Sequence, residues 1–236
     1  MQNGQKMLAV LLDPEKCQGK NLSDILSELD KATPDFIFIG GSSKSCSPDI
    51  LLNEVQKYPI AKILFPGDAS QFDSKADALL FLSLISGRNA DYLIGQHVRS
   101  ALEIKKSGIE VIPTGYILIN GGKIASVNIV SETQPISSDD LDNVLSTAVA
   151  GELLGMKLIY LEAGSGATHP VPSEMIAAVK KSLDIPLIVG GGISSVSQLK
   201  TVLDSGADLV VVGNHFEKNS EAISEFIHFM KKYNEK

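Results

Sequence analysis

The chain has 236 residues, of which 44% are hydrophobic and 21% are charged, so it is long enough to bury a substantial core and too apolar for a disordered segment. Its formal net charge is −7, and lysine and arginine never occur in runs longer than a pair, which argues against a nucleic-acid-binding protein. No apolar run reaches the roughly 18 to 20 residues of a membrane-spanning helix, so we expect a cytoplasmic protein with at most transient membrane contact.

Eight short apolar runs, rich in β-branched residues, recur along the chain. They are residues 7–12, 36–41, 61–67, 91–96, 110–119, 157–164, 186–192 and 209–214. The hydrophobicity of these runs is mostly continuous rather than alternating. This pattern predicts strands that are buried on both faces, as in a parallel sheet covered by helices.

Amphipathic segments with helical spacing lie between these runs. One covers residues 22–32, and Asn21 or Ser23 is its expected N-cap. Another covers residues 194–207, begins on serines and ends at Gly206. Strands and helices therefore alternate, and no linker rich in proline or serine divides the chain.

Eight strand–helix units in 236 residues favour a (β/α)₈ TIM barrel that forms a single domain over residues 1–236, with a doubly wound open sheet as the alternative. One connection, residues 120–140, is longer and more polar than a typical loop of this fold. It is expected to form either an active-site lid or a surface excursion with a small hairpin at residues 120–123.

Glycines follow the last two predicted strands. Residues 190–192 are three consecutive glycines, and Gly213 with Asn214 follows the final strand. In TIM barrels the loops after strands seven and eight commonly bind phosphate, and glycine lets backbone N–H groups approach the phosphate oxygens. The two turns predict a phosphate site, although tight turns and helix caps also use glycine.

A carboxylate ends the sixth predicted strand. Tyr160 and Glu162 are two residues apart and therefore share one face of that strand, and Gly164, Ser165 and Gly166 follow them. A glutamate on an apolar strand is rarely buried without a partner. Glu162 is expected either to pair with a lysine of the barrel or to accept a hydrogen bond or a proton from a substrate hydroxyl.

Asp13 ends the first predicted strand, directly before Pro14. It is either a turn or cap residue or, with Ser42 at the end of the neighbouring strand, a ligand of Mg²⁺, which relies on substrate phosphates for its remaining ligands. The four histidines have no zinc-ligand spacing, but His97 and His169 are expected just after strand ends, where either could contact an anionic substrate.

The segments LLDPEK, FIGGSS, YLEAGSGA, IVGGGI and VVGNHF occur in this order over nearly the full chain. As a set they resemble the geranylgeranylglyceryl phosphate synthase family, including its bacterial heptaprenylglyceryl phosphate synthase members. The resemblance implies a TIM barrel that transfers a polyprenyl group, with geranylgeranyl as the expected one, from its diphosphate to the 3-hydroxyl of sn-glycerol 1-phosphate, with Mg²⁺, to form an ether. We also expect a homo-oligomer.

The resemblance further implies Asp13 and Ser42 as magnesium ligands, and the position of Glu162 beside the glycerol loop makes it the candidate catalytic base. The residues implied for binding sn-glycerol 1-phosphate are Tyr160, Leu161, Glu162, Ala163, Gly164, Ser165, Gly166, Gly191, Gly192, Gly213 and Asn214.

Other interpretations stay open. Residues 79–86, with Phe65, Phe72 and Tyr116, form either an apolar groove for the prenyl tail or an ordinary helix core. On the same barrel, a phosphosugar isomerase, lyase or cyclase would use the same glycine turns. A non-catalytic phosphate-binding protein is the third possibility, since a fold does not establish a function.

Overall fold

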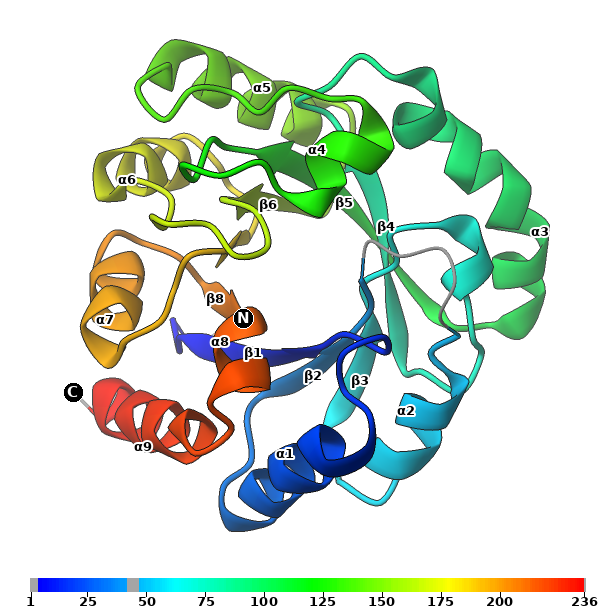
Figure 1. Cartoon of the computed structure of the whole chain (residues 1–236). Helices are drawn as coiled ribbons and strands as arrows, with labels where there is room; N and C mark the ends of the chain where they lie inside the picture. Colours follow the sequence, from blue (N-terminus) through cyan, green and yellow to red (C-terminus); the bar gives the residue numbers. More distant parts are fainter. Residues whose placement is uncertain (1–3, 42–46, 236) are drawn as a thin grey trace.

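The computed structural model describes residues 4–41 and 47–235, and in it eight parallel strands close into a barrel (Figure 1). The strands are β1 (Met7–Leu12), β2 (Phe36–Ile39), β3 (Ala61–Leu64), β4 (Ala78–Leu84), β5 (Glu110–Leu118), β6 (Leu158–Glu162), β7 (Leu187–Gly190) and β8 (Leu209–Val212). Each strand pairs with the next, and β8 closes the barrel on β1, with Ala9 opposite Val211. The predicted TIM barrel is confirmed.

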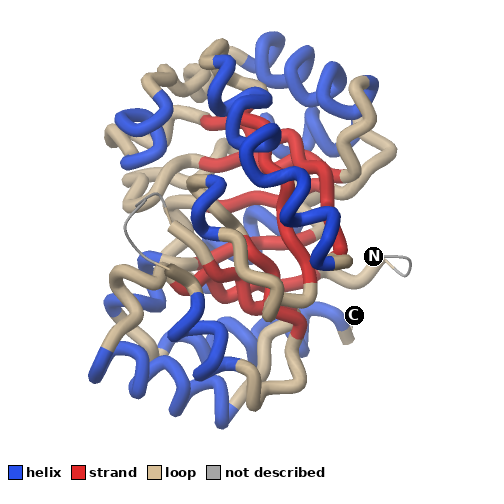
Figure 2. Tube along the Cα trace, turned by 90° about the vertical axis from the view of Figure 1, so that its right-hand side faces the viewer, coloured by secondary structure: helices blue, strands red, loops and turns tan. Residues whose placement is uncertain are grey.

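Helices surround the strands, as the side view in Figure 2 shows. They are α1 (Gly19–Lys31), α2 (Asp49–Val55), α3 (Gln96–Ser107), α4 (Ser126–Ser131), α5 (Leu141–Leu153), α6 (Ser173–Lys181), α7 (Val196–Asp204), α8 (Asn214–Lys218) and α9 (Ala222–Asn234), with a 3₁₀ turn η1 (Ala69–Gln71) and a π turn η2 (Asp91–Gly95). Both faces of the sheet are therefore buried, which is why the strands read as continuous apolar runs.

Alternation along the strands decides which side chains enter the barrel. On β6, Leu158 and Tyr160 belong to the apolar cluster inside the barrel, whereas Ile159 and Leu161 belong to the cluster between barrel and helices. The same period of two places Glu162 on the inner side, where it lines the cavity described below. Glu162, the last residue of β6, therefore points toward the open end of the barrel.

The fourth strand differs from its predicted position. Residues 91–96 were expected to form it, but they form η2 and the first residue of α3, and the strand is β4. The Asn89 side chain accepts a hydrogen bond from the Asp91 N–H at 3.0 Å, which starts a helical turn there. A short apolar run does not distinguish a strand from a helix by its periodicity, and both segments of this region are apolar.

The connection between β3 and β4 contains no α-helix. Residues 65–77 hold only the three-residue turn η1, whereas every other connection between successive strands contains at least one α-helix. A regular ring of eight helices is therefore interrupted at this position. Phe65, Phe72 and other residues of this connection line the cavity instead.

Two further expectations have opposite outcomes. The N-cap of α1 is Gln18, without a side-chain hydrogen bond, so the expected cap at Asn21 or Ser23 is wrong. The serine start of α7 is confirmed, because Ser195 is its N-cap and accepts a hydrogen bond from the Gln198 N–H at 3.2 Å.

The long connection at residues 120–140 contains α4 and joins the sheet through an isolated bridge between Ile119 and Ile136. Residues 120–123 form no hairpin, so that alternative is wrong. In Figure 1, α4 lies in front of β5 and β6, at the open end of the barrel. This position suits a covering role of the connection, and that role stays a prediction.

Candidate functional site

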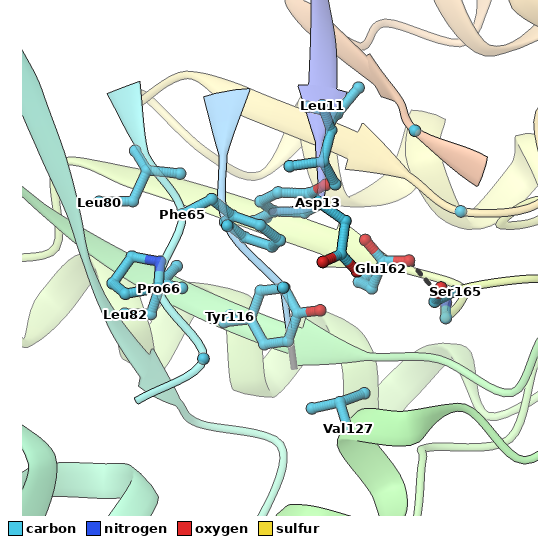
Figure 3. Close-up of a pocket in the computed structure, with 18 of the residues that line it drawn as sticks. Leu11, Asp13, Phe65, Pro66, Leu80, Leu82, Tyr116, Val127, Glu162 and Ser165 are labelled. Carbon is cyan, nitrogen blue, oxygen red and sulfur yellow. Dashed lines mark hydrogen bonds between the residues drawn. The ribbon is translucent and has the colours of Figure 1, made fainter. Parts of the chain in front are cut away.

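A cavity of about 420 Å³ lies at the carboxyl ends of the strands. In the close-up of Figure 3, Asp13, Glu162 and Ser165 lie on one side of it, and Leu80, Leu82 and Pro66 lie on the other. We call the first side the polar end, formed by Asp13, Lys16, Glu162, residues 164–166, Gly191, Gly192, Gly213, Asn214 and Glu217. We call the second side the apolar arm, formed by Phe72, Leu79, Leu80, Phe81, Leu82, His97, Ser100 and Ile104.

Glu162 is the buried carboxylate at the centre of the polar end. Only 7% of the residue is exposed, and its Oε1 accepts a hydrogen bond of 2.7 Å from the Gly164 N–H. Burial raises the pKa of Glu162 to about 7, although the bond from Gly164 and the neighbouring Tyr160 hydroxyl act in the opposite direction. Among the described residues, Glu162 forms no ion pair with a lysine of the barrel. The expectation that Glu162 is one half of a structural ion pair is therefore not supported.

Aromatic rings lie directly below this carboxylate. Tyr160 stacks on Phe65 with ring centroids 5.3 Å apart and meets Tyr116 edge-on at 5.2 Å. Burial, followed by the charge of Glu162, raises the pKa of both tyrosines well above the usual value, so their hydroxyls stay protonated at neutral pH. The floor between the polar end and the apolar arm is therefore aromatic and uncharged.

The glycine turn after β7 is packed against Glu162. Gly191 and Gly192 have φ values of +83° and +70°, a region that favours glycine. A Cβ on Gly191 would overlap Glu162 Oε1 and lie 2.8 Å from the Gly164 nitrogen. Within residues 4–41 and 47–235, the N–H groups of Gly191, Gly192 and Asn214 donate no backbone hydrogen bond, which leaves them available to an anion.

The loop after β6 faces the start of α8. The Ser165 hydroxyl donates a hydrogen bond of 3.1 Å to Asn214 Oδ1, which joins two segments that the sequence predicted to bind the acceptor. Leu161 and Ala163 differ from the other predicted residues, because their side chains lie in the cluster between barrel and helices. Neither residue lines the cavity, so the structure does not bring these two predicted residues into the site.

Asp13 lines the cavity and is buried. Its Oδ1 accepts a hydrogen bond of 3.0 Å from the Glu15 N–H, and its Oδ2 lies 3.2 Å from Lys16 Nζ. Gly41, at the end of the segment after β2, is so close that a Cβ there would lie 2.7 Å from the Asp13 carboxyl carbon. Ser42, the second predicted magnesium ligand, lies outside the described residues.

A lysine and a second glutamate complete the polar end. Lys16 Nζ lies 3.2 Å from Glu217 Oε2 and donates a hydrogen bond of 3.0 Å to Asn214 Oδ1. Partial burial alone would lower the pKa of Lys16, but Glu217 and Asp13 raise it overall, so the ammonium stays charged. Burial raises the pKa of Glu217, and Lys16 opposes this shift. Neither residue was predicted to be functional; the only signal in the sequence is the position of Lys16 three residues after Asp13.

The apolar arm runs between β4 and α3. The predicted groove residues Phe65, Phe72 and Tyr116 all line the cavity, as do several residues of β4. His97 lies in α3 and not after a strand; its ring contacts the Phe81 ring edge-on at 4.3 Å, and Nε2 lies 3.3 Å from the Ser83 hydroxyl. Burial lowers the pKa of His97, so it is neutral at pH 7 and unsuited to an anion. His169 is not among the lining residues.

Within the described ranges, no cluster of three or more histidine, cysteine, aspartate or glutamate side chains could hold a metal ion by itself. In the same ranges, no helix is long and apolar enough to cross a bilayer. The cytoplasmic location stays a prediction.

Comparisons with known proteins find relatives that match nearly the whole chain. The family model described as the PcrB family matches residues 3–230. A geranylgeranylglyceryl phosphate synthase of Flavobacterium johnsoniae is 50% identical over 220 residues, which cover 92% of this chain and 90% of that protein, and one of Korarchaeum cryptofilum is 37% identical with the same coverage. A crystal structure of (S)-3-O-geranylgeranylglyceryl phosphate synthase from Thermoplasma acidophilum, in complex with its substrate sn-glycerol-1-phosphate, superposes with a TM-score of 0.89 at 32% identity and covers 98% of this chain and 95% of that one.

Proposed function

The chain belongs to the PcrB family, and we propose that it transfers a geranylgeranyl group from its diphosphate to the 3-hydroxyl of sn-glycerol 1-phosphate, forming an ether and releasing diphosphate. The observation that carries this proposal is one cavity with glycine turns at one end, whose backbone N–H groups suit a phosphate, and an apolar arm at the other. A phosphosugar isomerase, lyase or cyclase has a wholly polar substrate and no use for the apolar arm.

We place the acceptor at the polar end. The N–H groups of Gly191, Gly192 and Asn214 suit its phosphate, and the adjacent loop of residues 164–166 suits its glycerol moiety. Glu162 then faces the glycerol hydroxyls from the end of β6. The Thermoplasma acidophilum structure, which is in complex with sn-glycerol-1-phosphate, supports the choice of this acceptor.

We place the prenyl tail of the donor in the apolar arm. Its lining includes side chains of β4, α3 and the β3–β4 connection, and Val127 and Val130 of α4 line the cavity as well. The neutral His97 near β4 adds no charge that the tail would have to desolvate. The donor's reactive carbon then lies where the arm meets the polar end, above Tyr116 and Tyr160.

The chemistry follows from these positions. The bond between the donor's first carbon and its diphosphate oxygen breaks, and positive charge develops on the allylic carbon. The ring faces of Phe65, Tyr116 and Tyr160, which pack against one another, would attract such a charge. The acceptor oxygen bonds to the carbon, and Glu162, with its pKa of about 7, accepts the hydroxyl proton.

Mg²⁺ fits the donor set at Asp13. Magnesium is usually held by one or two carboxylates and completes its shell with water and substrate phosphates, and Asp13 supplies one buried carboxylate that lines the cavity. Ser42 is the second proposed ligand. When bound, the ion would neutralise charge on the diphosphate and make it a better leaving group. Asp13→Asn should therefore lose magnesium-dependent turnover while calorimetry still detects acceptor binding; normal turnover would make the carboxylate structural.

We also propose a homo-oligomer. Ile94, Val98 and Leu102 are 58%, 69% and 77% exposed, and their spacing of four places them along one face of η2 and α3. Leu102→Glu should lower the molecular mass measured by light scattering. An unchanged mass would show that the interface does not include this face of α3.

The decisive experiment is a direct assay. Purified protein is incubated with Mg²⁺, geranylgeranyl diphosphate and radiolabelled sn-glycerol 1-phosphate, and the mixture is extracted with organic solvent. Label should enter the organic phase in step with diphosphate release. The enantiomer sn-glycerol 3-phosphate and a reaction without donor are the controls. Label that stays in water under all conditions would contradict the proposed function.

A further inference from the structure

Lys16 occupies the space between the proposed metal ligand and the proposed phosphate turn. Its ammonium contacts Asp13 Oδ2 at 3.2 Å, Glu217 Oε2 at 3.2 Å and Asn214 Oδ1 at 3.0 Å. A lysine ammonium has three N–H donors, so these three acceptors account for all of them. The contacts come from two segments that are far apart in the sequence: the turn after β1, which holds Asp13, and helix α8, which holds Asn214 and Glu217.

The charges around this ammonium are predominantly negative. Among the described residues that line the cavity, the carboxylates are Asp13, Asp68, Glu162 and Glu217. In the same part of the chain, two lysines line this space, Lys16 and the exposed Lys218, and only Lys16 is ion-paired with the carboxylates of the polar end. Under the proposed function, two substrates with negatively charged phosphates must nevertheless bind here. A cation at this position would compensate part of that negative charge.

We propose that the Lys16 ammonium binds the diphosphate of the prenyl donor and that Glu217 is the positioning residue that holds the lysine in place. The proposal rests on the proposed function. Asp13 would hold the magnesium ion with the carboxylate that now contacts Lys16, and one of the three lysine donors would then be available for a phosphate oxygen. Glu217, whose side chain is 7% exposed, stays behind the lysine as its remaining carboxylate.

The geometry favours the donor's diphosphate over the acceptor's phosphate. The acceptor phosphate already has the N–H groups of Gly191, Gly192 and Asn214, which donate no backbone hydrogen bond within the described residues. The released lysine donor is the one on the Asp13 side, where the proposed magnesium ion would meet the diphosphate. The Lys16 side chain is 42% exposed, so the ammonium reaches the open part of the cavity without rearrangement of the backbone.

Calorimetry separates the two phosphate sources. Inorganic diphosphate with Mg²⁺ and, separately, sn-glycerol 1-phosphate are titrated into wild type, Lys16→Met, Lys16→Arg and Glu217→Gln. Lys20→Met, an exposed position on α1 outside the cavity, changes the net charge equally and is the matched control. Lys16→Met should weaken diphosphate binding by about tenfold to a hundredfold, the range for a lost hydrogen bond between charged groups, and leave acceptor binding within about twofold.

Further outcomes sharpen the test. Lys16→Arg should recover part of the diphosphate affinity, Lys20→Met should match wild type, and Glu217→Gln should weaken diphosphate binding less than Lys16→Met does. Loss of acceptor affinity alone in Lys16→Met would assign the lysine to the other phosphate and overturn the proposal. Unchanged affinity for both would overturn it as well, since the contacts of the lysine would then be a surface ion pair. A wild type that forms no ether would instead contradict the proposed function, and that result is read from the extraction assay.

Discussion

The polar end and the apolar arm of one cavity are built in different ways. The polar end combines backbone with polar side chains. Glycine turns follow β7 and β8, and backbone N–H groups hold Glu162 and Asp13. Side-chain contacts of Lys16 and Asn214 join these segments. The arm is lined mainly by apolar side chains, from β4, α3 and the connection that lacks a helix, with His97 and Ser100 of α3 as its polar members. A substitution in the polar end should therefore change the chemistry, whereas one in the arm should change which donor binds and how tightly.

The largest difference between the two regions is expected from Glu162→Gln. It removes the proposed base but keeps the shape of the side chain, so kcat should fall by about 10²- to 10⁴-fold, the usual effect of losing a general base. Acceptor affinity, measured by calorimetry, should stay within about tenfold. Glu174→Gln, an exposed position on α6, is the control. Normal turnover in Glu162→Gln would mean that the proton goes to the departing diphosphate or to water.

Leu82→Asp tests the arm. The residue lines the cavity on β4, and a charge there must be desolvated by the prenyl tail, so the donor KM should rise roughly ten- to a hundredfold. Acceptor affinity should not change. The matched control is Leu153→Asp, at a position that is 83% exposed at the end of α5. An equal loss of acceptor affinity would show that the two regions are not separate.

The pH dependence of the reaction reports on the polar end alone. Burial raises the pKa of Glu162 from 4.5 to about 7, and the base must be ionised to accept a proton. Thus kcat/KM should rise by about tenfold per pH unit below about pH 7 and level off above it. Leu82→Asp should keep this profile, whereas Glu162→Gln should flatten it. A wild-type profile that is flat from about pH 5 to 8 would remove Glu162 as the base.

The same group links stability to pH. The folded state binds a proton at Glu162 up to a pKa of about 7, while the unfolded state releases it near 4.5. The contribution of this carboxyl to stability is therefore lost as the pH rises from about 4.5 to 7. We expect the free energy of unfolding in urea, measured at about pH 5 and about pH 8, to be higher for Glu162→Gln relative to wild type at about pH 8 than at about pH 5.

The smallest effect is expected for Ser165→Ala. It deletes one hydrogen bond of 3.1 Å to Asn214 in a partly exposed loop. A net loss of about 0.5 to 1.5 kcal/mol would weaken acceptor binding a few-fold to about tenfold, with no change in the donor KM. Calorimetry with the acceptor checks this, and a donor-specific effect would contradict the assignment of residues 164–166.

The sequence predicted the polar end better than the arm, for a physical reason. A turn that requires positive φ needs glycine, so residues 190–192 are visible as a motif, and Glu162 stands out because charge is rare on a buried strand. The barrel itself followed from the succession of apolar runs. Those runs misplaced one strand, because residues 78–84 and 91–96 are both apolar and only tertiary contacts separate a strand from a helix start.

Other parts of the site carry no sequence signal of their own. The contact of Lys16 with Glu217 joins residues that are far apart in the chain, and an exposed lysine is among the commonest of surface residues. The apolar lining of α4 and the missing helix between β3 and β4 are likewise consequences of packing. Such features become visible only once the strands are arranged around the barrel.

The tight packing of Gly191 against Glu162 constrains how this enzyme can change by mutation. Any side chain at Gly191 would meet the Glu162 carboxylate and the Gly164 nitrogen, so a substitution there also displaces the proposed base. A shorter residue at position 162 would relieve the overlap with Oε1 and remove the carboxylate, but the Gly164 and Ala163 nitrogens would still lie 2.8 and 2.9 Å from a Cβ on Gly191. The effects of substitutions at these two positions should therefore be strongly non-additive. A single substitution in this turn should not give the enzyme a new acceptor specificity.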